Sequence, residues 1–480
     1  MPILTSKNPS KRIESEIKSF CRDNTGKTLK VSDVPWLVKD QATEYAPEIK
    51  AAGFSLYTFQ NRPGLLKQGE LMLWPKNTVP PESKRIASRV RKRISIDLFA
   101  GAGGLSCGLE MAGFRPVLAN EWIDAYANTY AVNHPDAKTL KCDIRSIDAA
   151  LIKDLVAEHG EIDLIAGGPP CQGFSVNAPI RSLDDQRNHL FKEFIRVVEA
   201  VRPKAVLIEN VPGIVSLGQG TVVEQIYQHL NNLGYAVKHR ILFAGHYGVP
   251  QMRYRTVFIG IRNPEAEIKF PFPQYNATGV ANFTKAKELC FQLDDEKLAS
   301  LKKFTSVWDA IGDLPPLHGG ERDVEIDYPA PAETEFQKIM RKGSRYITSH
   351  FCNRLTSINI QRLAHIPQGG SWRDIPFDLL PQGLKIARRS DHTKRYGKLT
   401  LDGLCSTVLT KCDPHWGSFF HPTQARVISV REAARIQSFP DWYRFTGTMT
   451  EQYAQVGNAV PCLMAREIGK TIQQLLEVNE

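Results

Sequence analysis

The amino-acid sequence predicts an α/β fold, an open and mostly parallel Rossmann-like sheet, with a smaller irregular domain and an N-terminal extension. From residue 94 to residue 263, short apolar runs typical of buried strands alternate with helical patterns. Several of these runs end in turns rich in glycine or proline. Beyond residue 263 the alternation gives way to prolines, glycines and broken patterns. We therefore divide the chain into residues 1–93, 94–263, 264–423 and 424–480, the last returning to the second.

The first unit of the predicted sheet is a strand over residues 94–99, followed by a glycine turn and a helix that begins near Leu105. Glycine at Gly101 and Gly103 lets the backbone turn sharply and approach a ligand closely. Such a turn alone is a weak signal for a nucleotide site. It is not the dinucleotide fingerprint either, because the third glycine of that pattern is missing.

Polar or aromatic residues follow the next two predicted strands. Glu121 comes about 20 positions after the glycine turn, where an acidic residue accepts hydrogen bonds from ribose hydroxyls. Trp122 offers a flat face to an adenine ring, and Asp143 can accept from the adenine amino group. Either residue alone would be read as an ordinary surface acid or core aromatic. Three strand ends in succession favour a nucleotide-like cofactor.

The strand over residues 162–166 leads into the loop Gly167-Gly168-Pro169-Pro170-Cys171-Gln172-Gly173-Phe174-Ser175. The prolines stiffen this loop, and it lies at the carboxyl edge of the sheet, where open α/β folds bind ligands. Cys171 is the soft nucleophile that the loop presents. Two interpretations remain open from the loop alone: a reactive thiol, or one of the many cysteines that act as small buried hydrophobes.

The next strand, over residues 205–208, ends at Glu209. One helix separates it from the Cys171 strand, so a right-handed βαβ connection makes the two strand ends neighbours. Strands over residues 235–243 and 256–261 complete the sheet, and Arg253 and Arg255 alternate on one face of the extended segment between them. A structural cluster of ion pairs is the alternative interpretation for Glu209 with the two arginines.

The second half of the chain is less regular. Residues 371–376 and 406–410 stand out within it, and Lys394 and Arg395 suggest a face that contacts nucleic acid. Helices are expected over residues 429–439 and 463–475. In the N-terminal extension we expect a helix over residues 10–20, one or two strands within residues 51–74, a linker over residues 75–81, and a basic run before residue 94. That run is either a solvated face or a phosphate contact.

Composition excludes several classes of protein. The 480 residues carry a net charge of +10, which fits a polyanionic partner but also fits a merely basic soluble protein. No apolar run approaches the ~20 residues of a membrane span, and the first residues lack the apolar core of a signal peptide. The nine cysteines form neither a disulfide framework nor paired zinc spacing. We expect a cytoplasmic, nucleoid-associated protein with no membrane partner and no metal.

Eight motifs of the sequence resemble, in order, those of the DNA (cytosine-5) methyltransferases, from residue 94 to the C-terminus. These motifs are Asp97-Leu98-Phe99-Ala100-Gly101-x-Gly103-Gly104, Glu121-Trp122, Asp143-Ile144, Pro169-Pro170-Cys171-Gln172, Glu209-Asn210-Val211, Gln251-x-Arg253-x-Arg255, Arg431-Glu432-x-x-Arg435-x-Gln437-x-Phe439-Pro440 and Gly457-Asn458-Ala459-Val460-Pro461. Ala459 stands where many members have serine. Residues 1–93 lie outside the resemblance.

The resemblance implies an S-adenosylmethionine-dependent methyltransferase of the bacterial restriction-modification type, acting on double-stranded DNA with base flipping. It implies Cys171 as nucleophile, with Glu209, Arg253 and Arg255 on the cytosine, and residues 264–423 as the target-recognition domain. DNA contacts are expected at Gln172, Ser175, Thr407, Lys394 and Arg395. The expected cofactor-binding residues are Phe99, Gly101, Gly103, Glu121, Trp122, Asp143, Ile144, Pro170, Leu190, Asn458 and Val460.

The chemistry fits these residue types. A thiolate that adds to carbon 6 of cytosine makes carbon 5 nucleophilic, and a buried carboxyl with a raised pKa can neutralise the ring at nitrogen 3. The alternative hypotheses are that the chain is a tRNA methyltransferase, or, with less support, a dehydrogenase. An additional hypothesis is a DNA-binding regulatory role for residues 1–93. We expect a monomer on DNA, and the bases that flank the target cytosine cannot be read from sequence.

Overall fold

The structure, a computed structural model, describes residues 19–21, 23–24, 28–30, 54–58, 70–75, 92–170, 190–279, 286–321 and 325–480. The chain divides into two compact units, Met1–Arg91 and Lys92–Glu480, and each is described by itself. Cys171, Gln172 and Ser175 lie outside the described residues. Their predicted roles therefore stay predictions.

The first unit contains a three-stranded antiparallel sheet. Its strands are β1 (Thr28–Lys30), β2 (Phe54–Thr58) and β3 (Glu70–Pro75), and β3 lies in the middle. Strands β2 and β3 confirm the expectation of strands in this part of the chain. Of the expected helix over residues 10–20 the structure describes only residues 19 and 20, which are helical, whereas nearly all of the linker and most of the basic run fall outside the described residues.

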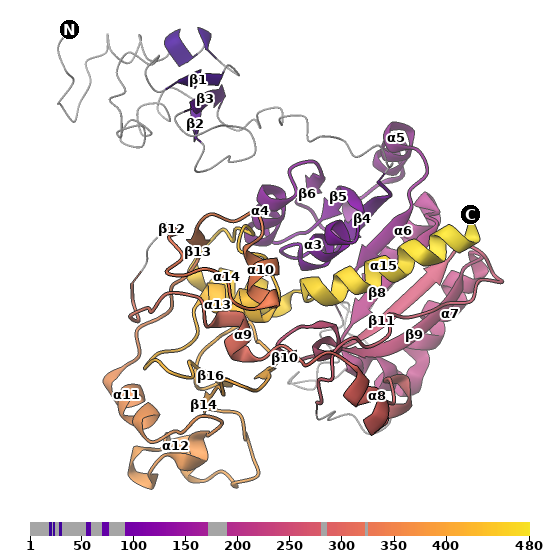
Figure 1. Ribbon diagram of the computed structural model, residues 1–480. Coiled ribbons are helices and arrows are strands. Elements are labelled where there is room, and N and C mark those ends of the chain that lie inside the picture. The colour runs from indigo at the N-terminus through magenta and orange to yellow at the C-terminus, as the bar shows by residue number, and fades with distance from the viewer. Residues whose placement is uncertain are drawn as a thin grey trace. The chain divides into compact units, whose positions relative to one another are not determined.

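The second unit is built on a seven-stranded sheet in the order β6-β5-β4-β7-β8-β11-β9 (Figure 1). The strands are β4 (Ile94–Leu98), β5 (Arg115–Asn120), β6 (Lys138–Leu140), β7 (Leu164–Gly167), β8 (Ala205–Asn210), β9 (Ala236–Phe243) and β11 (Tyr254–Ile261). Strand β11 runs antiparallel to its neighbours β8 and β9, whereas the other neighbouring pairs are parallel. The predicted open, mostly parallel sheet is confirmed. Glu209 lies within β8, because that strand continues past residue 208.

Apolar side chains on both faces bury the sheet, as continuous apolar strands predict. Side chains alternate along each strand. Leu207 therefore packs into one hydrophobic core, and its neighbours Val206 and Ile208 pack into the other. Helices α5 (Ala149–His159), α6 (Leu190–Val201) and α7 (Thr221–Asn232) cover the second core. Helices α3 (Gly104–Met111) and α15 (Cys462–Asn479) cover the first, and α4 (Asp124–Asn133) follows β5.

Within residues 264–423, the α-helices and strands that the structure describes are all short. These are α8 (Asp295–Ser300), α9 (Val307–Ile311), β12 (Glu325–Ile326), α10 (Glu335–Arg341), β13 (Ile347–Thr348), α11 (Ser357–Ala364), α12 (Gln382–Lys385), β14 (Gly397–Lys398), β15 (Cys405–Ser406) and β16 (Ser418–Phe420). Part of the segment packs into the core beneath the sheet, through Val307 and Ala310 among others. A second part forms a small separate core around Trp372, Leu363 and Phe420.

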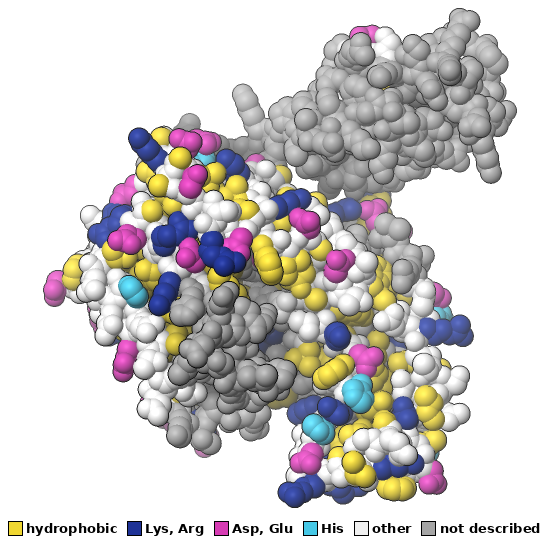
Figure 2. All heavy atoms as spheres, turned by 180° about the vertical axis from the view of Figure 1, so that it is seen from behind, with side chains coloured by type: hydrophobic (Ala, Val, Ile, Leu, Met, Phe, Trp, Pro, Cys, Tyr) yellow, Lys and Arg dark blue, Asp and Glu magenta, His cyan; other side chains and the backbone are white. Residues whose placement is uncertain are grey.

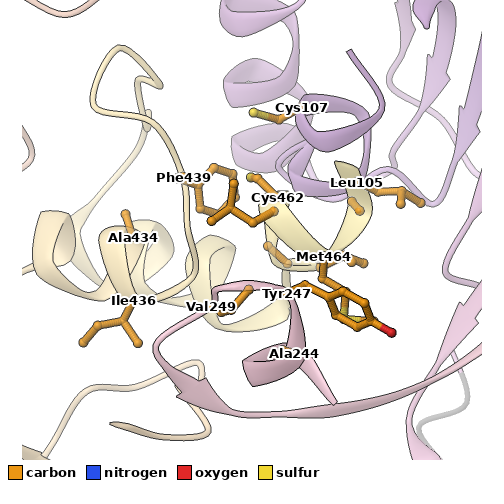
Figure 3. Packing of buried hydrophobic residues seen from close by; sticks show 14 of the residues in the cluster. Leu105, Cys107, Ala244, Tyr247, Val249, Ala434, Ile436, Phe439, Cys462 and Met464 are labelled. Carbon is orange, nitrogen blue, oxygen red and sulfur yellow. The ribbon is translucent and has the colours of Figure 1, made fainter. Parts of the chain in front are cut away.

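The C-terminal segment packs against the sheet half of the unit, where α15 lies against α3. It contains α13 (Val430–Ile436), α14 (Met449–Asn458) and α15. Cys107 of α3, Tyr247, Phe439 and Met464 of α15 meet in one apolar cluster, although they are far apart in sequence (Figure 3). Helix α13 ends three residues earlier than expected, and α15 is longer than the predicted helix at both ends.

Buried arginines hold the irregular half of the unit together. Arg435 binds both Asp441 and Asp313 with ion pairs, and Arg426 binds Glu432. Arg431 donates to the carbonyl oxygens of Thr348, Pro440 and Tyr443. A guanidinium carries five N–H donors, so one side chain can satisfy several carbonyls that no regular ladder reaches. Among the described residues no helix is long and apolar enough to cross a bilayer.

Helices α3 and α15 pack so closely that Gly108 has no room for a side chain. A Cβ atom there would overlap the Cβ of Ala465 and the carbonyl oxygen of Cys462. We expect Gly108→Ala to lower the free energy of unfolding by about 1–3 kcal/mol, because the helices must separate. Thermal and chemical denaturation of the full chain measure this effect.

The matched control is Gly383→Ala in α12, where a Cβ atom meets nothing within 4 Å. This change should leave stability unchanged or raise it by up to ~1 kcal/mol. Equal losses in the two variants would contradict the packing explanation.

Candidate active site

The loop that leads into Cys171 begins against the end of β8. Asn210 donates from Nδ2 to the carbonyl oxygen of Pro169 at 2.9 Å. A Cβ atom at Gly168 would lie 3.1 Å from Oε2 of Glu209. Strands β7 and β8 are parallel neighbours, with Gly167 opposite Ile208. The described start of the Cys171 loop therefore lies beside the Glu209 side chain, as expected for the ends of neighbouring parallel strands.

Glu209 is paired with Arg255 across the boundary between β8 and β11. Nε of Arg255 lies 2.6 Å from Oε1 of Glu209, and each side chain is 13% exposed. Burial lowers the pKa of Arg255, and the carboxylate of Glu209 opposes that shift. The pair places a carboxyl group and guanidinium N–H groups side by side in a largely desolvated setting. Such a pair can hold both an acceptor and a donor of one planar ring.

Arg253 lies differently, although it is only two residues from Arg255. Its guanidinium is buried and donates from Nη1 to the carbonyl oxygen of Val408 at 3.3 Å. Nη2 donates to the carbonyl oxygens of Gly457 and Ala459 at 2.9 and 3.1 Å. The sequence predicts that both arginines donate to a nucleotide. In the structure, the guanidinium of Arg253 instead donates to backbone carbonyls. The backbone already engages the terminal nitrogens of Arg253.

The glycine turn after β4 has the geometry expected of a ligand-binding loop. Phe99, Gly101 and Gly103 have positive φ angles of 55°, 57° and 88°. A Cβ atom at Gly101 would meet nothing within 4 Å, so the backbone borders open space. Glu121 accepts from the N–H groups of Gly101 and Ile123 at 2.9 and 2.8 Å. Burial raises the pKa of the Glu121 carboxyl, and these two N–H groups oppose that shift.

The remaining cofactor candidates lie at the ends of neighbouring strands and in the C-terminal segment. The side chain of Trp122 is 70% exposed, which leaves its ring free to stack. Asp143 is held by Arg145, whose hydrogen bonds lower its pKa to about 2. Asn458 donates from Nδ2 to the hydroxyl of Tyr126 at 3.2 Å. Ile144 and Val460 are buried, and Pro170 and Leu190 are half-buried.

Comparison with known proteins decides the family. The family model described as C-5 cytosine-specific DNA methylase matches residues 94–474. The chain belongs to this family. It is similar to the type II methyltransferase M.AgeI of Thalassovita gelatinovora, with 35% identity over 79% of this chain and 99% of that protein. It is 34% identical to the type II methyltransferase M1.HphI of Haemophilus parahaemolyticus, over 79% and 86% of the two chains.

A solved structure of a DNA modification methyltransferase encoded within an E. coli prophage has the same fold. It is 27% identical, covers 80% of this chain and 99% of its own, and has a TM-score of 0.61. The enzyme class and the methyltransferase fold predicted from the eight motifs are thereby confirmed. The chain is a DNA (cytosine-5)-methyltransferase.

The methyltransferase carries its predicted recognition residues in two places. Thr407 lies beside the candidate site, since β15 pairs with β10 (Gln251–Met252) and Oγ1 of Thr407 donates to the carbonyl oxygen of Met252 at 2.6 Å. Lys394 is exposed on the lobe that contains α11 and α12, where Lys, Arg and His side chains lie among hydrophobic ones (Figure 2). There the guanidinium of Arg395 lies 6.0 Å from the ring centre of half-exposed Trp416.

Two polar residues of the site were quoted in motifs but not predicted as functional. Asn210 follows Glu209 directly, and its contact with Pro169 is a side-chain hydrogen bond that no residue spacing in the sequence marks. Asp97 is buried behind the glycine turn and accepts from Oγ of Ser106 at 2.6 Å. Its Oδ1 has no hydrogen-bond partner within the described part of the chain. A charged residue inside an apolar strand is the signal that marks Asp97.

Asp97 should make the stability of the methyltransferase depend on pH. Burial raises its pKa to about 7, whereas hydrogen bonding from Ser106 and the nearby His134 oppose the rise. A carboxyl whose pKa is higher in the folded state stabilises the fold while it is protonated, and this contribution is lost as pH rises toward 7. The melting temperature of the wild type should therefore fall relative to Asp97→Asn between pH 5 and pH 8.

Asp148→Asn is the control, because that carboxyl caps α5 near the surface and accepts from the Leu151 N–H. A wild-type curve that keeps a constant offset from Asp97→Asn over this pH range would show that Asp97 does not titrate there.

Proposed function

We propose that the chain transfers a methyl group from S-adenosylmethionine to carbon 5 of a flipped-out cytosine in double-stranded DNA, through a transient bond between Cys171 and carbon 6. The observation that carries the proposal is the Glu209–Arg255 pair, which lies beside Gly168 at the start of the Cys171 loop. Family membership supplies the reaction class. Carbon 5 lies within a stacked duplex, so the base must leave the helix to reach this pair.

Each side chain has a defined part in the proposed reaction. The Cys171 thiolate donates an electron pair to carbon 6, the new S–C bond forms, and the π electrons of the ring move toward carbon 5 and nitrogen 3. Glu209 shares a proton with nitrogen 3 and so neutralises the charge that develops there. Arg255, held by Glu209, donates to the ring carbonyl oxygen. Once carbon 5 carries the methyl group, its proton passes to solvent, the thiolate departs, and nitrogen 3 returns its proton to Glu209, which restores the aromatic ring and frees Cys171.

The residues at the neighbouring strand ends fit a bound S-adenosylmethionine. The open space beside Gly101, the exposed Trp122 ring and the carboxylate of Glu121 suit a backbone-lined turn, an adenine and a ribose. When bound, the cofactor supplies an electrophilic methyl group. The residues proposed to hold it are Phe99, Gly101, Gly103, Glu121, Trp122, Asp143, Ile144, Pro170, Leu190, Asn458 and Val460.

The proposed biological role is protection of DNA in a restriction-modification system, because the relatives M.AgeI and M1.HphI are type II methyltransferases. Gln172, Ser175, Thr407, Lys394 and Arg395 are proposed to contact the DNA. Bisulfite sequencing of DNA from a host that expresses the chain identifies the modified sites. Comparison of methyl transfer to duplex DNA and to total tRNA tests the alternative substrate.

Replacement of the nucleophile tests the covalent step. With a duplex that carries 5-fluorocytosine at the modified position, the wild type should form an adduct that survives denaturation, because fluorine cannot leave as a proton does. Cys171→Ser should form none and should lose methyl transfer. The control is Cys290→Ser, a half-buried thiol outside the site, which should behave as wild type. An adduct in Cys171→Ser would refute Cys171 as the nucleophile.

Glu209→Gln tests the proton at nitrogen 3. The amide keeps the shape of the side chain but cannot share that proton, so the rate of methyl transfer should fall by about 10²–10⁴-fold while duplex binding is retained. The control is Glu161→Gln, whose carboxylate pairs with Lys204 and Arg262 at the opposite edge of the sheet. Loss of duplex binding with an unchanged single-turnover rate would contradict the assigned role.

A further inference from the structure

Arg253 joins two segments that lie far apart in sequence. One acceptor of its guanidinium is the carbonyl of Val408, the residue after Thr407. The other two are the carbonyls of Gly457 and Ala459, which flank Asn458. The first segment carries the proposed recognition threonine, and the second carries a proposed cofactor residue. One side chain therefore fixes the backbone on both sides of the candidate site.

Gln251 makes a second connection between the same segments. Its Oε1 accepts from the N–H of Val408 at 2.9 Å, and its Nε2 donates to Oε1 of Gln437 at 2.6 Å. Gln437 in turn donates to the carbonyls of Val456 and Ala459 at 2.8 and 2.9 Å. The N–H and C=O of Val408 are thus both used, one by Gln251 and the other by Arg253.

The two segments also touch directly. A Cβ atom at Gly457 would overlap the carbonyl group of Leu409 and approach the N–H of Thr410 at 2.6 Å. Two backbone segments that pack this closely cannot move independently. In a close-packed interior, a segment that shifts displaces the segment in contact with it. A displacement of the segment at Thr407 is therefore passed to the C-terminal end of α14, which carries Asn458.

The burial of the Arg253 guanidinium indicates that its contacts have a specific structural role. Its side chain is 1% exposed, and Nε has no hydrogen-bond partner within the described part of the chain. Burial lowers the pKa of Arg253 well below its usual value, and the charge of Arg255 adds to that shift. In some proteins, a buried polar or charged group specifies one arrangement of the segments around it. The contacts of Arg253 with two segments fit this role.

We propose that Arg253 is a positioning residue that couples cofactor binding to DNA binding, by holding the backbone at Val408 and at Gly457–Ala459 in one fixed arrangement. The inference rests on the proposed function, since it takes Thr407 to face DNA and Asn458 to face the cofactor. Coupling of this kind is reciprocal: each ligand raises the affinity for the other by the same factor, typically about 5–150-fold.

The test is a binding cycle with S-adenosylhomocysteine and a duplex that contains the site found by bisulfite sequencing. In the wild type, the cofactor product should tighten duplex binding by about 5-fold or more. In Arg253→Lys, the single ammonium group cannot donate to both segments at once as the planar guanidinium does. The factor by which S-adenosylhomocysteine tightens duplex binding should therefore fall toward 1. The affinity for each ligand alone should change much less than the factor does.

The matched control is Arg431→Lys. Arg431 is also fully buried and also donates to three backbone carbonyls, but those acceptors lie in neither of the two segments. It should lower the melting temperature about as much as Arg253→Lys does and keep the wild-type coupling factor. Should Arg253→Lys fail to fold, Gln251→Met removes the second connection instead and should lower the factor partially.

Three results would overturn the inference. The first is that the wild type binds the two ligands with independent affinities. The second is that Arg431→Lys loses the coupling as Arg253→Lys does. The third is that Arg253→Lys keeps the full coupling and loses only the 5-fluorocytosine adduct. The last result would place Arg253 on the cytosine itself. A wild type that binds neither ligand would instead refute the proposed function.

Discussion

The pairing of β7 with β4 on one side and with β8 on the other is the constraint on which the candidate active site depends. Parallel strands end at the same edge of a sheet, so the glycine turn after β4 and the described residues 168–170 after β7 begin side by side, next to the Glu209 end of β8. The chain order reverses direction across the sheet between β4 and β7. Ligands of open α/β sheets bind where this reversal occurs.

The irregular half of the chain meets a different constraint. Its short helices and two-residue strands leave many backbone carbonyls without a partner in a ladder, and buried carbonyls must find donors. Arg253 and Arg431 supply them, each with a guanidinium that reaches three carbonyls. Arg435 likewise donates to the carbonyl of Ala310 and to the carboxylates of Asp313 and Asp441. The segment around Thr407 is therefore fixed to the sheet by side chains as well as by the pairing of β15 with β10.

This division explains which predictions succeeded. Strands such as β7 and the first part of β8 agree with their apolar runs, because a strand buried on both faces is continuously apolar. Helix ends agree less well, as at α13, since the last turn depends on contacts outside the helix. The short elements of residues 264–423 were not predicted individually. Each is too short for a periodic pattern to mark it.

The sequence by itself favoured β7 and β8 as neighbours, and so placed the start of the Cys171 loop near Glu209, because strands joined through one helix usually lie side by side. It also determined the family, through eight motifs in one order. Only the tertiary structure decided that Arg255 pairs with Glu209 while Arg253 turns to backbone carbonyls. Those carbonyls lie 155 to 206 residues further along the chain, and alternation along a strand carries no information about partners so distant.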